Sequence, residues 1–359
     1  MIYNVIGLMS GSSHDGLDIA FVEITDIRND WSFEIKHAAC IPFEKDMETN
    51  LRQAATRPVP EFLKLHTTFG RWIGTQVVDF IEQNGLHHKV HFVASHGHTV
   101  FHDPENKTSV QIGDGASISA ITGLPTITDL RNADVALAGQ GAPIVPIADR
   151  KFFNDFKYCL NIGGICNVTI NDAAPVAFDI VPANQVLDYF AQASGKAFDA
   201  EGAWAAKGTV HDSVLAALNA LPYYQSEGPK SLANEYSKQL IELIENSGMS
   251  NVEDILATLV AHITEQIALA LKPYLVAEPS KMLVTGGGAL NQFLVAQLSA
   301  ALEAQGIEVV IPEENIVHYK EALAMAFIGV LRWREEENVL ASVTGAAKNS
   351  IGGALWLGN

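Results

Sequence analysis

The stretch Gly7-Leu8-Met9-Ser10-Gly11-Ser12-Ser13-His14-Asp15-Gly16-Leu17-Asp18-Ile19 decides how this chain begins to fold. An apolar run from Ile2 to Met9 predicts a strand, and a second apolar run, Ile19 to Ile24, leaves the turn. Small residues in such a turn let backbone N–H groups and hydroxyls close around an anionic group, and Asp15 or Asp18 could hold a metal ion against it. The alternative is an ordinary hairpin turn, which the loop alone does not exclude.

The hydrophobic pattern then runs along the chain twice, each time as three strands followed by alternating helices and strands. The first pass predicts strands over residues 2–9, 17–24, 31–39, 90–94, 109–112 and 125–128, and helices over 44–55, 61–84 and 115–122. The second pass predicts strands over 157–162, 166–170, 176–179, 281–284 and 308–311, and helices over 184–194, 213–220, 231–245, 252–271, 291–305 and 319–335. This repetition predicts two lobes of the same α/β kind.

Composition limits the classes of protein that the chain can belong to. Its 359 residues are enough for two domains, and a hydrophobic content of 48% supports substantial cores. The 41 acidic residues exceed the 23 basic ones, which gives a net charge of −18 and argues against nucleic acid or an anionic membrane as a partner. Three cysteines, no signal-like N-terminus and no unbroken run of about 18 apolar residues predict a cytoplasmic protein.

The opening loop resembles the phosphate loop of the anhydro-N-acetylmuramic acid kinases, which belong to the actin/hexokinase/heat-shock ATPase superfamily. Further blocks resemble that family in the same order: Ser95–Pro104, Gln111–Asp114, Thr128–Val135, Gly139–Pro146, Leu160–Ile165, Phe178–Asn184, Gly286–Asn291, Glu321–Phe327 and Ser342–Gly345. The resemblance implies two ribonuclease-H-like lobes facing an interdomain cleft. We expect residues 1–130 to form the N-terminal lobe, which the C-terminal segment is a candidate to join, and residues 131–359 to form the C-terminal lobe with an adenosine motif.

The resemblance also implies a reaction. Family members use ATP and Mg²⁺ to open the 1,6-anhydro bridge of anhydro-N-acetylmuramic acid with water and to phosphorylate O6. The products are N-acetylmuramic acid 6-phosphate and ADP, formed in the recycling of cell-wall peptidoglycan, and a homodimer is an expected assembly. Two alternatives remain open from the sequence. One is another sugar kinase or a phosphohydrolase of the same fold, and the other is a non-catalytic, ATP-responsive binding protein.

Asp179 is the predicted catalytic base, because it ends a predicted strand just before a helix and matches the family's Asp in Phe178–Asn184. The alternative is that Asp179 caps that helix. The chain departs from the family pattern here, since Ile180-Val181 replaces a polar residue or Cys and a glycine, so the backbone loses freedom near the phosphates. Further departures are His14, Gly115 and the run 199–202.

Three glycine-containing turns are the predicted nucleotide site. The resemblance assigns to it Gly11, Ser12, Ser13, His14, Asp15, Gly16, Leu17 and Asp18 in the first turn, Gly163 and Gly164 in the second, and Gly286, Gly287, Gly288 and Asn291 in the third, with Asp15 as the Mg²⁺ ligand. Glycines at a strand-to-helix turn allow a flat adenosine to lie against bare backbone. For the third turn, the alternative is a tight turn made for packing.

For the sugar, the resemblance points to His96, Gly97, His98, Asp114, Arg131, Asp134 and Glu321. The planar guanidinium of Arg131 suits the lactyl carboxylate, and the alternative is a structural ion pair with Asp134 or Asp129. Glu321 lies in a predicted amphipathic helix, where the alternative is an ordinary surface carboxylate. The histidines at 96, 98 and 102 invite a zinc interpretation, but with no cysteine nearby a substrate-loop role is favoured.

Overall fold

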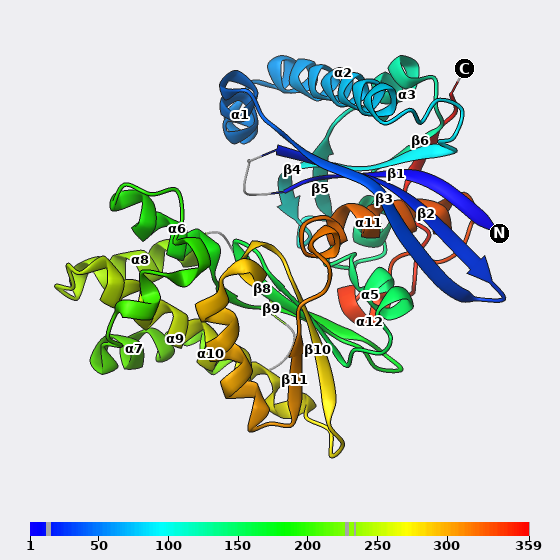
Figure 1. Cartoon of the computed structure of the whole chain (residues 1–359). Coiled ribbons are helices and arrows are strands. Elements are labelled where there is room, and N and C mark those ends of the chain that lie inside the picture. Colours follow the sequence, from blue (N-terminus) through cyan, green and yellow to red (C-terminus); the bar gives the residue numbers. More distant parts are fainter. Residues whose placement is uncertain (12–15, 227–229, 233–234, 359) are drawn as a thin grey trace. The chain divides into compact units, whose positions relative to one another are not determined.

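The computed structural model describes residues 1–11, 16–226, 230–232 and 235–358. The chain forms two compact units, of which unit 1 comprises Met1–Phe152 and Tyr319–Asn359, and unit 2 comprises Phe153–His318 (Figure 1). The division therefore falls after Phe152, whereas the sequence placed it after residue 130. The C-terminal segment belongs to unit 1, as the sequence analysis allowed. Each unit is built on its own β-sheet.

The sheet of unit 1 begins with an antiparallel meander whose strands follow one another in sequence. The whole sheet consists of β1 (Ile2–Ser10), β2 (Gly16–Ile27), β3 (Asp30–Pro42), β4 (Phe92–Asp103), β5 (Thr108–Ile112), β6 (Thr126–Thr128) and β12 (Ala354–Trp356), of which the first three form the meander. The strand order is β12-β6-β4-β1-β2-β3, and β5 pairs with β4. Strand β4 is parallel to β1 and β6 is parallel to β4, so the helices must cross over between them.

Helices cover both faces of this sheet. They are α1 (Lys45–Arg52), α2 (Val59–Gln83), α3 (Gly115–Thr122), α4 (Asn132–Ala136), α5 (Pro146–Phe152), α11 (Glu314–Trp333) and α12 (Ala341–Thr344), with one 3₁₀ turn, η1 (Ala54–Thr56). On one face, Phe69, Ile73 and Val77 of α2 pack in one core with Ile6 and Leu8 of β1. Their spacing of three or four residues is the apolar stripe that predicted the helix.

On the opposite face, α11 packs directly on the backbone of β1 and β4. A Cβ atom at Gly7 would overlap the carbonyl oxygen of Ala322, and one at Gly329 would lie 2.6 Å from the Cβ of Ala94. Only residues without side chains, or with a methyl group, allow a helix and a sheet to approach this closely. Small residues in the first strand and in the last long helix therefore fix the C-terminal segment to unit 1.

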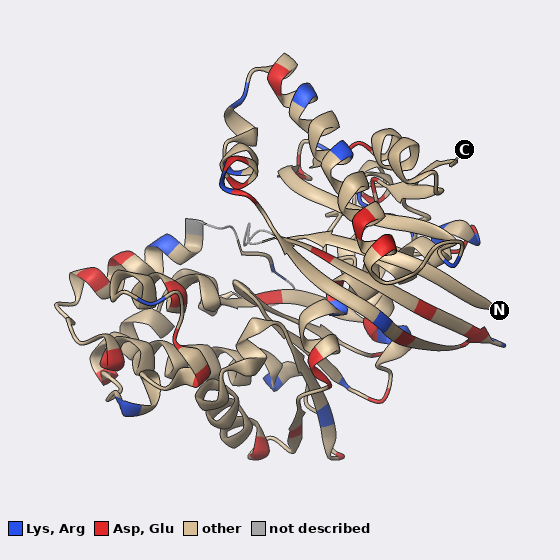
Figure 2. Ribbon diagram, turned by 45° about the horizontal axis from the view of Figure 1, so that its top comes forward, with Lys and Arg blue, Asp and Glu red and all other residues tan. Residues whose placement is uncertain are grey.

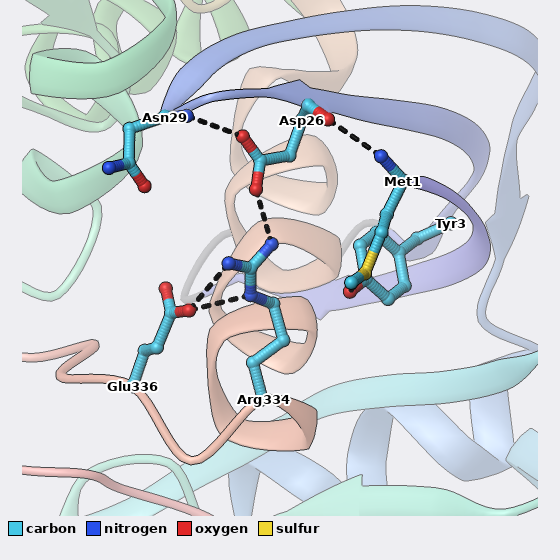
Figure 3. Close-up of polar contacts among 6 residues, drawn as sticks. All are labelled: Met1, Tyr3, Asp26, Asn29, Arg334 and Glu336. Atoms are coloured by element: carbon cyan, nitrogen blue, oxygen red, sulfur yellow. Dashed lines mark hydrogen bonds and ion pairs between the residues drawn. The ribbon is translucent and has the colours of Figure 1, made fainter.

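Arg334, just after α11, ties the same segment to the β1–β2 hairpin (Figure 3). Its Nη1 lies 2.6 Å from Oδ2 of Asp26, and its Nε donates to Oε1 of Glu336 at 2.7 Å. The Arg334 guanidinium lowers the pKa of Asp26, and the two carboxylates raise the pKa of Arg334. The guanidinium also lies 4.9 Å from the ring centroid of Trp31. These contacts join residues from the two ends of the chain.

Unit 2 repeats the architecture of the first sheet. Its strands are β7 (Tyr158–Ile162), β8 (Ile165–Ile170), β9 (Val176–Pro182), β10 (Ser280–Thr285) and β11 (Ile307–Val310), in the order β11-β10-β7-β8-β9. Its helices are α6 (Asn184–Ala193), α7 (Asp212–Asn219), α8 (Glu235–Asn246), α9 (Val252–Leu271) and α10 (Gln292–Glu303). The 3₁₀ turns are η2 (Ala200–Gly202), η3 (Ala205–Lys207), η4 (Pro222–Gln225), η5 (Lys272–Tyr274) and η6 (Gly287–Leu290).

Helix α9 is the centre of the unit 2 core. Leu256, Leu259, Ile263 and Ile267 have no exposed side-chain surface and belong to one cluster with the strands. With η5, this helix is long and apolar enough to cross a membrane by length and composition alone, but 67% of its apolar window is buried within the protein. Its apolar character is therefore explained by packing inside unit 2.

In each sheet the first strand of a three-stranded antiparallel meander has a parallel strand on its other side, and the shared order is β3-β2-β1-β4-β6 in unit 1 and β9-β8-β7-β10-β11 in unit 2. In unit 1, β5 and β12 are additional antiparallel strands, paired with β4 and β6 respectively. This topology confirms the predicted ribonuclease-H-like fold in each unit. The predicted strands and helices are present with shifts at their ends, the largest in β4, which was predicted over residues 90–94 and runs over Phe92–Asp103. Elements α4, α5, α12 and the edge strand β12 were not predicted. The predicted cleft between the lobes stays a prediction. Lys and Arg positions are spread over both units among the more numerous acidic ones (Figure 2).

Candidate functional site

Asp179 lies inside strand β9, in unit 2, and is held there by three hydrogen bonds. Its backbone N–H donates to the carbonyl of Lys230 at 2.9 Å, and its own carbonyl accepts from the hydroxyl of Tyr223 at 2.6 Å. Its carboxylate Oδ2 accepts from the N–H of Leu232 at 2.9 Å. Helix α6 begins later, with Ala183 as its N-cap, so the helix-cap alternative for Asp179 is wrong. The strand also continues past Asp179 to Pro182, further than predicted.

Burial raises the pKa of Asp179, and the hydrogen bond from Leu232 opposes that rise because it stabilises the ionised form. Among the described residues, the second carboxylate oxygen has no hydrogen-bond partner. The side chain is thus a half-buried carboxylate with one oxygen anchored and the other available to accept a proton. A raised pKa makes a carboxylate a better base, as long as the operating pH lies above it.

A β-bulge at Ile180 decides where the residues after Asp179 point. Asp179 pairs with Asn167, and Val181 pairs with Cys166, the adjacent residue on β8, so Ile180 is the extra residue. Without the bulge, Val181 would share a face with Asp179; with it, Val181 joins the fully buried core. Val181 therefore does not share the face that carries Asp179, and the expected effect of Ile180-Val181 on the backbone near the phosphates stays a prediction.

The same register places Asp179 in a row of polar residues that crosses the sheet. Thr285 of β10 pairs with Asn161 of β7, Asn161 pairs with Asn167 of β8, and Asn167 pairs with Asp179 of β9. Paired residues on neighbouring strands project from the same face, so these four side chains line one face of the sheet. The sequence analysis missed Asn161, Asn167 and Thr285, since each lies in an otherwise apolar strand and only the pairing brings them together.

Two glycine turns lie at the end of this row. Gly163-Gly164 follows β7 and Gly286–Gly288 follows β10, and these two strands are parallel neighbours. A Cβ atom at Gly163 or Gly287 would approach no atom closer than 3.5 Å, whereas one at Gly288 would overlap the side chain of Ile162. Gly163 and Gly287 therefore have room for a Cβ in ordinary van der Waals contact, whereas Gly288 is required for packing. Packing explains Gly288, and the predicted nucleotide contact of the third turn stays a prediction.

Two asparagines hold these turns in place. Asn184 donates its side-chain amide to the carbonyl of Ile162 at 3.2 Å, which fixes the start of α6 against the second turn. Asn291 is the N-cap of α10, because its Oδ1 accepts from the N–H of Leu294 at 3.0 Å. A Cβ at Gly202 would overlap that same Oδ1 atom. The structure thus gives Asn291 a capping role, and a contact with nucleotide stays a prediction.

The run 199–202 is one of the departures from the family pattern, and the structure explains its first residue. Asp199 accepts hydrogen bonds from the N–H groups of Trp204 at 2.9 Å and Ala205 at 3.0 Å. Gly115 is a second departure with a visible reason, because a Cβ there would overlap Trp356 and Thr128. The indole N–H of Trp356 donates to Oγ1 of Thr128 at 3.0 Å. A larger residue at position 115 would displace this pair.

The opening loop of unit 1 is described at its two ends. Ser12, Ser13, His14 and Asp15 lie outside the described residues, so their predicted roles, including that of Asp15 as metal ligand, stay predictions. Gly11 follows β1, and Gly16, Leu17 and Asp18 open β2. A Cβ at Gly16 would lie 2.5 Å from the carbonyl oxygen of Ile41 on β3, so this glycine is required by strand packing. Ser10, which ends β1, lies with its Oγ 2.9 Å from Nδ1 of His98.

His96 and Arg131 form a buried pair in unit 1. Nε of Arg131 donates to Nε2 of His96 at 2.8 Å, and Nδ1 of His96 donates to the carbonyl of Gly97 at 2.9 Å. The histidine is therefore neutral, with its proton on Nδ1. Burial and, to a smaller extent, the positive charge of Arg131 together lower the pKa of His96 to about 3. Gly97 has a φ of 74°, in the left-handed region that favours glycine.

Arg131 remains a cation, although burial lowers its pKa to about 10. Its Nη1 donates to the carbonyl of Gly141 at 2.6 Å. Within the described chain it forms no ion pair within 4 Å, so the alternative of a structural pair with Asp129 or Asp134 is wrong. Nη2, the remaining end of the guanidinium, makes no hydrogen bond to the described residues.

Asp134 and Asp114 use their carboxylates to organise unit 1. Asp134 is fully buried and accepts from the Gly141 N–H at 2.8 Å and from the Thr344 hydroxyl at 2.7 Å. Asp114 is the N-cap of α3, with its Oδ2 accepting from the N–H of Ser117 at 3.0 Å. These contacts give both carboxylates a structural role, and their predicted contact with sugar stays a prediction.

Glu321 lies near the start of α11, half-buried, in the helix that packs on β1. Burial raises its pKa, while the positive charges of Lys320 and Arg131 lower it and the negative charge of Asp149 raises it. It makes no side-chain hydrogen bond or ion pair within the described part of the chain. The helix was predicted, and its carboxylate stands beside Arg131 rather than on an isolated surface.

No group of three His, Cys, Asp or Glu side chains suited to a metal ion occurs among the described residues. His96 uses both ring nitrogens as described, and Nδ1 of His102 lies 3.1 Å from Oγ of Ser109. The zinc interpretation of these histidines is therefore not supported by the contacts that they make.

Two ribonuclease-H-like units, one of which carries a half-buried carboxylate beside bare glycine turns, define the class of actin-like phosphotransferases. The chain belongs to the anhydro-N-acetylmuramic acid kinase family, since the model of the family described as anhydro-N-acetylmuramic acid kinase matches residues 3–358. It is 32% identical to the anhydro-N-acetylmuramic acid kinase of Coxiella burnetii (strain Dugway 5J108-111), over 98% of this chain and 97% of that one. It is 33% identical to the protein of the same name from Pseudomonas paraeruginosa (strain DSM 24068 / PA7), over 98% of each.

Among solved structures, the chain is similar to the activator of the 2-hydroxyisocaproyl-CoA dehydratase from Clostridium difficile, solved with bound ADPNP. The identity is 14%, the TM-score is 0.41, and the alignment covers 93% of this chain and 96% of that one.

Proposed function

We propose that this protein is an ATP-dependent kinase that opens 1,6-anhydro-N-acetylmuramic acid with water and phosphorylates O6. Water forms the new bond to the anomeric carbon, the bond from that carbon to O6 breaks, O6 takes the γ-phosphoryl group, and ADP leaves. The products are N-acetylmuramic acid 6-phosphate and ADP, so the enzyme is a phosphotransferase with an alcohol group as acceptor. Membership of the kinase family supports this reaction. The reaction is proposed to serve the recycling of cell-wall sugars in the cytoplasm.

The observation that carries the proposal is the presentation of Asp179. The Leu232 N–H anchors one carboxylate oxygen at 2.9 Å, and the bulge at Ile180 turns the neighbouring Val181 into the core. The second oxygen is left to take the proton of the attacking water. O6 leaves the anomeric carbon as the nucleophile for phosphorus, so one base serves both bond changes. Positioning and charge neutralisation then supply the remaining acceleration, as is usual in phosphoryl transfer.

The nucleotide is proposed to lie against the glycine turns of unit 2. Gly163 and Gly287 carry no side chain, and a bare backbone of this kind suits the close approach of a phosphate and a flat adenosine. Asn161 and Asn167 on the polar row carry amide donors that suit phosphate oxygens. Mg²⁺ needs only one or two carboxylates when phosphates supply its other ligands. Asp15 is the proposed ligand, and the bound ion would neutralise phosphate charge.

The sugar is proposed to contact the polar residues of unit 1. Nη2 of Arg131 remains to pair with the lactyl carboxylate, because the other two nitrogens are held by His96 and Gly141. The unpaired carboxylate of Glu321 suits a sugar hydroxyl. Since the net charge of the chain is −18, an anionic sugar must be recognised by such local donors and not by the overall field.

Mass spectrometry of the products formed from ATP, Mg²⁺ and the anhydro sugar in ¹⁸O-water tests the proposal. We expect a 6-phosphate whose bridging oxygen carries no label and one ¹⁸O at the anomeric carbon. Preformed N-acetylmuramic acid 6-phosphate in the same water is the control for exchange at that carbon. Release of ADP without a phosphorylated sugar would indicate a different acceptor or a phosphohydrolase. Nucleotide binding with no turnover would indicate a binding protein.

A further inference from the structure

The residues on both sides of Glu321 contact other parts of unit 1. On one side, Nζ of Lys320 lies 3.1 Å from Oδ1 of Asp149 on α5. On the other side, Ala322 packs so closely on β1 that a Cβ at Gly7 would overlap its carbonyl oxygen. The helix has its one non-helical residue just before this point, at Tyr319, with φ −116° and ψ 15°. Glu321 therefore begins a regular helical segment that is held at its first residues.

The Lys320–Asp149 pair is too deeply buried to be an ordinary surface contact. The side chains are 4% and 2% exposed, respectively. A buried ion pair is weak evidence for stability, because well-packed apolar residues of similar volume often serve equally well or better. What apolar residues would not supply is a fixed positive charge next to Glu321. The pair is thus explained better by its effect on a neighbouring charge than by its contribution to folding.

The charges around Glu321 come from three elements. Lys320 lies on α11 itself, Arg131 precedes α4, and Asp149 lies on α5. Burial of the Glu321 carboxylate favours its protonated form, and a protonated carboxyl would be a poor acceptor for a sugar hydroxyl. Two positive charges oppose this effect and one negative charge reinforces it. The Glu321 carboxylate itself has no hydrogen-bond partner among the described residues that could do the same.

We propose that Lys320, held 3.1 Å from Asp149 in a buried pair, is a positioning residue whose fixed charge aligns the neighbouring Glu321 carboxylate to bind the sugar. The inference rests on the proposed function, because it assumes that Glu321 faces the sugar. It assigns to the ion pair a role in substrate binding that the pattern around Glu321 did not suggest. Lys320 acts only through its neighbour, so its removal should weaken sugar binding and leave nucleotide binding unchanged.

The two members of the pair should have opposite effects on Glu321. Lys320→Met removes an attractive charge, so the pKa of Glu321 should rise. Asp149→Asn removes a repulsive charge, so the pKa of Glu321 should fall. Carbon-detected NMR of ¹³C-glutamate-labelled protein, with the Glu321 signal assigned by its loss in Glu321→Gln, measures both shifts directly. Lys157→Met, which breaks the Lys157–Asp172 ion pair in unit 2, is the matched control and should cause no shift.

A purely structural pair would shift the Glu321 titration in the same direction for both variants or not at all, and either result would overturn the inference. If the single variants do not fold, the double variant Lys320→Met/Asp149→Leu removes both charges together. Because Lys320 affects Glu321 more than Asp149 does, its Glu321 pKa should still rise above that of the unchanged protein. An unchanged titration in the double variant would also overturn it.

Kinetics separate this inference from the proposed function. In Lys320→Met, kcat/KM for the sugar should fall about tenfold, the loss expected for one charge-assisted hydrogen bond, while KM for ATP stays unchanged. If the NMR shifts appear but Glu321→Gln leaves KM for the sugar unchanged, then Glu321 does not face the sugar and the proposed site is wrong. If Glu321→Gln raises KM but the shifts are absent, the positioning role of Lys320 is wrong.

Discussion

Replacement of Asp179 by Asn should separate catalysis from folding. The Asn side chain keeps an oxygen that can accept from the Leu232 N–H, now at 2.9 Å from the carboxylate, so the local contacts of β9 are preserved. Burial raises the pKa of Asp179, so the ionised carboxylate is less favourable in the folded than in the unfolded protein. A neutral amide removes that cost at neutral pH, and Tm should be equal to or higher than that of the unchanged protein.

Although Asp179→Asn should not lower stability, it should lower activity strongly. Loss of a general base lowers the rate by a factor on the order of 10³, which corresponds to about 4 kcal/mol in the activation barrier. ADP release in a coupled assay measures kcat, and calorimetric titration with ATP measures nucleotide affinity, which should change less than about threefold because the amide makes no new contact. The expected variant is therefore stable, binds ATP and turns over very slowly.

Tyr223→Phe is the matched control. It removes the hydroxyl that donates to the Asp179 carbonyl at 2.6 Å but leaves the carboxylate in place. This variant should lose about 1 kcal/mol of stability and retain most of its activity. If Asp179→Asn keeps more than a tenth of the normal kcat, Asp179 is not the base. A marked fall in Tm together with loss of ATP binding would mean that the residue is structural.

Three further predictions follow from the same contacts. Activity should decline on acidification, because the raised pKa of Asp179 means that its protonated, inactive form is already populated at pH values above the ordinary pKa of 3.8. The residual activity of Asp179→Asn should lack that pH dependence. Gly287→Ala should raise KM for ATP without lowering Tm, since its Cβ has room. Gly288→Ala, whose Cβ overlaps Ile162, should lower the free energy of unfolding by about 1–3 kcal/mol. Equal losses of Tm in the two variants would contradict this prediction. Arg334→Met should lower the free energy of unfolding in urea by about 1–3 kcal/mol. Because Arg334 lowers the pKa of Asp26, this stabilisation is present at neutral pH and is lost as the pH falls through the pKa of Asp26 in the folded protein. The difference in free energy of unfolding between the variant and the unchanged protein should therefore shrink below about pH 4, and a constant difference would contradict the prediction.

Local patterns predicted most of the fold because they depend on residues close in sequence. The alternation in β1 to β3 and the apolar stripes of α2 and α9 each report on one element at a time. The boundary between the units was harder to predict from the sequence, because it depends on contacts between β1 and α11. Gly7 and Ala322 meet across most of the length of the chain, and a single sequence contains no sign of their proximity.

The residues of the candidate site likewise fall into those that local sequence identifies and those that only contacts between distant segments identify. Asp179 and the glycine turns stand out in sequence because each is unusual in its local setting. Asn161, Asn167 and Thr285 do not, since their significance comes only from pairing across strands. The bulge at Ile180 was not predictable either, because it is a property of the register between β8 and β9.

The discontinuous course of unit 1 has a consequence for how the chain is made. Unit 2, Phe153–His318, is continuous and can complete its core as soon as it leaves the ribosome. Unit 1 is synthesised first but lacks α11 until the end of translation, so the face of β1 and β4 that receives Ala322 and Gly329 stays uncovered meanwhile. The later-made unit should therefore mature first, and a chain stopped after His318 should hold a folded second unit beside an unfinished, aggregation-prone first one.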